Sequence, residues 1–209
     1  MKRIYEKRVV PVAVLERAED AVPVTEALMA GGLDIIEVTL RTAGAVEAIR
    51  RIVSAHPNVL VGAGTILAAE QVKAAVDAGA AFGVAPGLNE KIVACARERN
   101  LPFVPGVMTP SEVERAMDLG CRLLKFFPAD AAGGIKMLKS LAGPYAHTGV
   151  KFLPLGGVGA ANAAEYLALP VVGAIGGSWL VEKSLVAEKN WREITRRTAE
   201  IVQIVGGVR

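Results

Sequence analysis

The 209 residues include 24 Lys and Arg against 21 Asp and Glu, and this net charge of +3 is too small and too evenly spread to indicate nucleic-acid binding. The N-terminus lacks the apolar run of a signal peptide and no segment is long enough to span a bilayer, so we expect a cytoplasmic protein with no membrane partner. The length suits one domain, residues 1–209. We interpret the densest basic stretch, REITRR (192–197), as the solvated face of a helix.

Short apolar runs alternate with amphipathic segments along the whole chain. Each run has the length of a strand, and most have Gly, Pro or Thr at or beside their ends. In chain order the runs are VVPVAVL from Val9, DIIEVTL from Asp34, LVGAGTI from Leu60, AFGVAPG from Ala81, PFVPGVM from Pro102, RLLKFFP from Arg122, KFLPLGG from Lys151 and VVGAIGG from Val171.

The segments between these runs have helical periodicity. The segment after the first run places four apolar residues on one face: Ala21, Val24, Ala27 and Leu28. TPSEVERAMDLG begins with the cap residues Thr109 and Ser111. A closing helix is predicted from about Lys189 to Val205.

These alternating units favour an α/β fold, a single (β/α)8 TIM barrel. An open sheet of eight parallel strands is the alternative. Such a sheet normally shows GxGxxG after its first strand, and this chain does not.

Lys125 is the most unexpected residue in a predicted strand, because Leu123, Leu124, Phe126 and Phe127 surround it. Burial lowers the pKa of an amine, and a neutral amine attacks ketones to form imines. The alternative is a lysine at a strand end that reaches solvent.

Glu37 shares strand parity with Thr39 and Arg41. A buried carboxylate here is either half of a structural ion pair with Arg41 or a general acid/base. The forked donors of Arg41 suit a substrate carboxylate. Thr65, near the end of the third run, is a weaker candidate for the same carboxylate, because Gly-Thr is an ordinary strand-to-helix transition.

Glycine pairs follow the last two runs, at Gly156 and Gly157 and at Gly176 and Gly177, the latter followed by Ser178. Glycine allows backbone amides to approach an anion, and the seventh and eighth loops of barrels commonly bind phosphate. Ordinary turns are the alternative. The two cysteines and two histidines form no metal-ligand pattern, so no metal site is expected.

Together these segments resemble the 2-keto-3-deoxy-6-phosphogluconate (KDPG) / 4-hydroxy-2-oxoglutarate (KHG) aldolase family, class I. The resemblance covers nearly the whole chain, through AGGLDIIEVTLRT, VGAGTI, VAPGL, PFVPGVMTPSEV, LLKFFPAD, FLPLGGV and IGGSWLV.

The resemblance implies a Schiff-base aldolase that cleaves KDPG to pyruvate and glyceraldehyde 3-phosphate, or KHG to pyruvate and glyoxylate. It implies Lys125 as the Schiff-base lysine and Glu37 as the general acid/base, with neither a metal nor an organic cofactor. It also implies a homotrimer and the following substrate-binding residues: Arg41 and Thr65 for the carboxylate, Pro86 and Phe127 along the pocket, and Gly156, Gly157, Gly177 and Ser178 for a distal phosphate.

One position departs from the resemblance: Leu155 stands where the family usually has threonine, in PLGG rather than PTGG. Related aldolases for the galactonate epimer are similar in having an apolar residue there. We therefore leave open that epimer as substrate, as well as oxaloacetate decarboxylation and an oligomeric barrel scaffold, natural or engineered.

Overall fold

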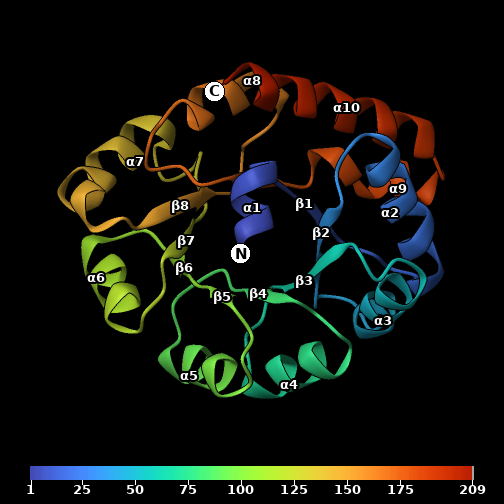
Figure 1. The fold of residues 1–209 in the computed structure, drawn as a ribbon, viewed down its shortest axis with the longest axis horizontal. Helices are drawn as coiled ribbons and strands as arrows, with labels where there is room; N and C mark the ends of the chain where they lie inside the picture. Colours follow the sequence, from blue (N-terminus) through green and yellow to red (C-terminus); the bar gives the residue numbers. More distant parts are fainter. Residues whose placement is uncertain (209) are drawn as a thin grey trace.

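The computed structural model describes residues 1–208, with short parallel strands near the centre, a ring of helices around them and the N-terminal helix α1 over the middle of the view (Figure 1). The strands are β1 (Val9–Ala13), β2 (Ile35–Thr39), β3 (Leu60–Gly64), β4 (Phe82–Val84), β5 (Phe103–Val104), β6 (Gly106–Val107), β7 (Leu123–Phe126), β8 (Lys151–Pro154) and β9 (Ile175–Gly177). The α-helices are α1 (Lys2–Lys7), α2 (Ala21–Ala30), α3 (Ala45–Ala55), α4 (Ala69–Asp77), α5 (Glu90–Glu98), α6 (Pro110–Asp118), α7 (Gly134–Ala142), α8 (Ala160–Leu167), α9 (Lys183–Ala187) and α10 (Trp191–Gly207). Three 3₁₀ helices complete the described elements: η1 (Ala18–Asp20), η2 (Gly143–Thr148) and η3 (Trp179–Val181).

The strands form two parallel sheets, one of six strands in the order β5-β4-β3-β2-β1-β9 and one of three in the order β6-β7-β8. All eight predicted runs contain strand residues, with two differences from prediction. The fifth run is two strands, β5 and β6, because Pro105 lies between them and proline has no N–H for a ladder. In the eighth run, which starts at Val171, the strand β9 begins only at Ile175. Val172, earlier in that run, makes an isolated β-bridge to Phe152.

The two sheets approach each other where β8 meets the residues before β9. The Phe152 amide donates to the Val171 carbonyl at 2.8 Å, and the Gly173 amide donates to the Phe152 carbonyl at 2.9 Å. The architecture is therefore a curled parallel α/β arrangement with helices outside the strands (Figure 1).

The helices bury the faces that their periodicity predicts. In α2 the four predicted core residues are all buried: Ala21, Val24, Ala27 and Leu28. Thr109 is the N-cap of α6 and its hydroxyl accepts from the Glu112 amide at 3.4 Å, whereas Ser111 lies inside the helix and is not the cap. The last helix begins at Trp191, two residues later than predicted, because Asn190 caps it.

Side chains in β1, β2 and β7 are buried along the full length of each strand. An apolar core is continuous between these strands and the surrounding helices. Glu37, Thr39 and Lys125 are thus polar residues in otherwise apolar, buried strands. Within residues 1–208, no helix has both the length and the apolar composition required to cross a membrane.

Candidate active site

A cavity of about 430 Å³ opens at the carboxyl ends of the strands. In parallel α/β folds this is the end where strand termini and loops gather functional side chains. All ten residues named from the sequence line it: Glu37, Arg41, Thr65, Pro86, Lys125, Phe127, Gly156, Gly157, Gly177 and Ser178.

Lys125 lies in β7, between β6 and β8, and only 5% of its surface is exposed. Its backbone is fixed from both neighbours, and its amide donates to the Pro105 carbonyl at 2.8 Å. The Nζ atom lies 4.8 Å from the centre of the Phe127 ring. Burial lowers the pKa of Lys125, with Arg41 acting in the same direction and Glu37 opposing it. The alternative of a lysine extending into solvent is therefore wrong.

Glu37 lies in β2, opposite Val12 and Gly62, and is completely buried. Neither carboxylate oxygen has a hydrogen-bond partner among residues 1–208. Burial raises the pKa of Glu37, and the positive charges of Lys125 and Arg41 only partly oppose this effect. The site thus holds a carboxyl group that keeps its proton more readily than usual, beside an amine that loses its proton more readily.

Gly64, in the neighbouring strand β3, provides the space that the Glu37 side chain occupies. A Cβ atom at Gly64 would collide with the Glu37 carboxylate. The second glycine of VGAGT, Gly64, is therefore explained by its close packing against Glu37. The alternation of residues along the strand does not by itself reveal this role.

Arg41 does not form the structural ion pair with Glu37 that the sequence left open. Its Nε instead contacts the Thr39 hydroxyl at 3.4 Å, and it is found in no ion pair within the described chain. Thr65, on the adjacent loop, adopts φ = 56°, a left-handed conformation that is rare for a β-branched residue. Such strain costs about 1–3 kcal/mol and is concentrated at functional positions.

The two glycine loops form the other part of the cavity wall. Gly156 and Gly157 have φ values of 90° and 80°, which an L-residue adopts only with strain. Among the described residues, the amides of Gly157 and Ser178 donate to no other group, so both are free to meet a ligand. The carbonyl of Gly157 is held by the Asn162 side chain at 2.9 Å.

Sequence patterns did not single out several cavity residues as site residues: Val12, Thr39, Val158, Trp179 and Glu182. A partial signal was present for two of them, since Thr39 shares strand parity with Glu37 and Trp179 directly follows the IGGS turn. No pattern pointed to Glu182, because a single acidic residue in a loop is usually solvated.

Comparisons with known proteins agree over almost the whole chain. Residues 1–197 match the family described as KDPG and KHG aldolase. The chain belongs to this family. It is 46% identical to the KHG/KDPG aldolase of Escherichia coli K12, over 93% of this chain and 91% of that one.

Two solved structures of family members have the same fold. The KDPG aldolase of Legionella pneumophila, captured with pyruvate as a covalent carbinolamine, is 40% identical with a TM-score of 0.90, covering 94% of this chain and 95% of that one. The enzyme of Zymomonas mobilis ZM4, solved with 3-phosphoglycerate, is 39% identical with a TM-score of 0.88, covering 97% and 95%.

Within this family the departure at Leu155 has a local packing partner. Leu155 is almost fully buried, and a Cβ atom at Gly176 would lie 2.7 Å from its Cδ1. Leucine is accommodated there because the opposing residue is glycine. The cavity wall is consequently apolar at this position.

Proposed function

We propose that this protein is a class I aldolase that cleaves KDPG to pyruvate and glyceraldehyde 3-phosphate through a Schiff base on Lys125. The observation that carries the proposal is the buried Lys125 beside the unpartnered Glu37 in one cavity. The relative captured as a pyruvate carbinolamine supports the same chemistry. Cleavage of KHG to pyruvate and glyoxylate is a second activity, supported by the double name of the E. coli relative.

The neutral amine of Lys125 attacks the C2 ketone of the substrate, and loss of water from the carbinolamine gives an iminium ion. Glu37 donates the proton that the departing water needs, and the upward shift of its pKa on burial favours the protonated form that this step uses. Arg41 and Thr65 hold the substrate carboxylate and so fix C2 against Lys125.

The C3–C4 bond then breaks as Glu37, now ionised, removes the C4 hydroxyl proton. The bonding electrons move to the iminium nitrogen, so glyceraldehyde 3-phosphate leaves and an enamine remains. Protonation at C3 and addition of water to the imine release pyruvate and restore Lys125. Pro86 and Phe127 form an apolar wall beside the reacting atoms. The phosphate binds to the free amides of Gly157 and Ser178, next to Gly156 and Gly177.

Reduction with borohydride in the presence of pyruvate, followed by peptide mass mapping, tests this mechanism. We expect a reduced pyruvyl adduct on the peptide that contains Lys125. An adduct on a different lysine, or none on folded protein, would contradict it. A lactate dehydrogenase-coupled assay with KDPG, its galactonate epimer and oxaloacetate then separates the alternatives that share the enamine.

We further propose that residues 1–209 form one domain in which the two sheets act as a closed (β/α)8 barrel. The hydrogen bonds of Phe152 to Val171 and Gly173 support this closure. The homotrimer is a prediction from the resemblance, and the cytoplasmic location is a prediction from the sequence. Light scattering of the purified chain measures the subunit number, and a monomer at working concentration would contradict the trimer.

A further inference from the structure

Glu182 is a cavity-lining carboxylate that the proposed mechanism does not use. It follows η3, four residues after Ser178, and therefore belongs to the part of the wall proposed for the distal end of the substrate. It is formally the N-cap residue of α9, but its side chain makes no capping hydrogen bond. Helix capping thus does not account for its position.

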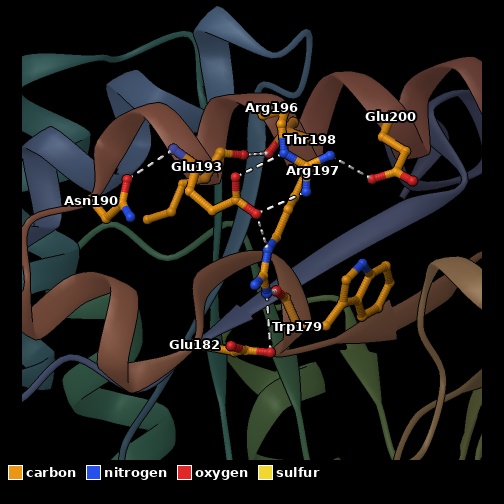
Figure 2. A network of polar contacts seen from close by, with 9 residues as sticks. Trp179, Glu182, Asn190, Glu193, Arg196, Arg197, Thr198 and Glu200 are labelled. Atoms are coloured by element: carbon orange, nitrogen blue, oxygen red, sulfur yellow. Dashed lines mark hydrogen bonds and ion pairs between the residues drawn. The ribbon is translucent and has the colours of Figure 1, made fainter.

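Arg197, from α10, fixes Glu182 from outside the cavity. Its Nη1 lies 3.0 Å from a Glu182 oxygen and donates to the Trp179 carbonyl at 2.6 Å, as Figure 2 shows. Arg197 is only 25% exposed on its side chain and does not line the cavity. This residue corrects the interpretation of REITRR (192–197) as a solvated face, because Arg197 points inward.

The positive charge of Arg197 is shared between two carboxylates. Its Nε donates to Glu193 at 2.9 Å, and Glu193 also receives two hydrogen bonds from Arg196 (Figure 2). These arginines hold the pKa of Glu193 at about 2, so that carboxylate is ionised at neutral pH. Glu182 is consequently held in place without being fully neutralised.

Apart from Arg41 and Lys125, no basic residue of the described chain lines the cavity. The two positively charged lining residues, Arg41 and Lys125, are assigned to the carboxylate and C2 of the substrate. Basic residues of neighbouring loops are engaged elsewhere: Lys183 contacts Glu16 at 2.7 Å, and Arg17 contacts Glu19 at 2.6 Å. A phosphate dianion at this end meets backbone amides and one carboxylate, whereas a hydroxyl group meets a hydrogen-bond acceptor.

We propose that Glu182, positioned by Arg197, is a specificity-determining residue that weakens the preference for a phosphorylated substrate and favours 2-keto acids whose distal end carries free hydroxyls. This inference rests on the proposed aldolase function. Its physical basis is repulsion between Glu182 and the phosphate, combined with hydrogen bonds from hydroxyls to the same oxygens.

The test compares kcat/KM for KDPG and for unphosphorylated 2-keto-3-deoxygluconate in wild type, Glu182→Gln and the exposed control Glu188→Gln. Glu182→Gln is expected to raise kcat/KM for KDPG by about threefold to tenfold, mainly through KM, and to lower it slightly for the unphosphorylated substrate. Glu188→Gln should change neither value. The gain on KDPG should shrink in high salt, because it is electrostatic.

Arg197→Met should have the opposite effect to Glu182→Gln. It keeps the negative charge of Glu182 but removes the positive charge that lies beside it. We expect KM for KDPG to rise while kcat changes little, and the melting temperature of this variant checks that it remains folded. An unchanged substrate ratio in Glu182→Gln, with pyruvate still trapped on Lys125, would overturn the role of Glu182 alone. Failure of trapping would instead overturn the aldolase function, and with it this inference.

Titration with glycerol 3-phosphate adds a readout that needs no turnover. Glu182→Gln should bind this probe more tightly than wild type. Equal or weaker binding would contradict the proposed repulsion.

Discussion

Two of the cavities in the described chain lie at opposite ends of the strands, and they differ in which residues are buried. The cavity at the carboxyl ends, about 430 Å³, contains Glu37 and Lys125 with almost no exposure. The cavity at the amino ends, about 490 Å³, begins at Phe103 and Leu123, the first residues of β5 and β7. Its charged residues include Arg97 and Arg122, both exposed to solvent.

The comparison shows that the reactive end is identified by ionisable side chains that are buried without an ion-pair partner. Cavity volume does not distinguish the two ends. Arg97 and Arg122 keep their hydration and need no partner. Cys121, in the amino-end cavity, has its pKa raised by burial, which keeps the thiol protonated and weakly nucleophilic. Glu37 and Lys125 instead bear a desolvation cost that catalysis explains.

The largest effect is expected from removing the amine. Lys125→Ala should reduce kcat for KDPG by about 10⁴-fold or more and abolish borohydride trapping, because no other group can form the imine. Lys73→Ala, an exposed lysine of α4, is the matched control. Near-normal turnover by folded Lys125→Ala would refute the mechanism.

A smaller but still large effect is expected from adding one methyl group beside Glu37. Gly64→Ala should displace the Glu37 carboxylate and reduce kcat by about tenfold to a hundredfold, at a stability cost of about 1–3 kcal/mol. Gly143→Ala is the control, because a Cβ there meets no atom within 4 Å. Equal kcat in both variants would show that the position of Glu37 does not govern the rate.

The buried carboxyl should also affect stability in a pH-dependent way. Because the folded pKa of Glu37 is raised, the folded state binds more protons than the unfolded state between the two pKa values. Wild type should therefore lose stability as pH rises from about 4.5 through the raised pKa. Glu37→Gln lacks this loss, so its melting temperature should rise relative to that of wild type as pH increases from about 4.5 through the raised pKa of Glu37. A difference that is constant over this range would mean that Glu37 is not desolvated in solution.

The smallest effect is expected at the opposite cavity. Arg122→Ala should leave kcat and KM for KDPG within about twofold of wild type, since exposed charges away from a site contribute little. A larger loss of kcat, with the protein folded, would show that the amino-end cavity is coupled to the reaction and would weaken the contrast between the two ends.

Local patterns determined much of this protein. The strand runs, the buried faces of helices such as α2, and the polar residues Glu37 and Lys125 follow from periodicity of two or 3.6 residues, which depends only on neighbours in sequence. Even the division at Pro105 has a local cause, although the pattern of the fifth run did not show it.

Tertiary structure decided which of these polar residues meet. Glu37 and Arg41 are four residues apart and yet remain unpaired, whereas Glu37 and Lys125 share a cavity because curvature of the sheets brings β2 and β7 toward one space. Arg197 reaches Glu182 only because α10 packs beside η3. These distances depend on sheet curvature and helix docking, which no pattern of neighbouring residues encodes.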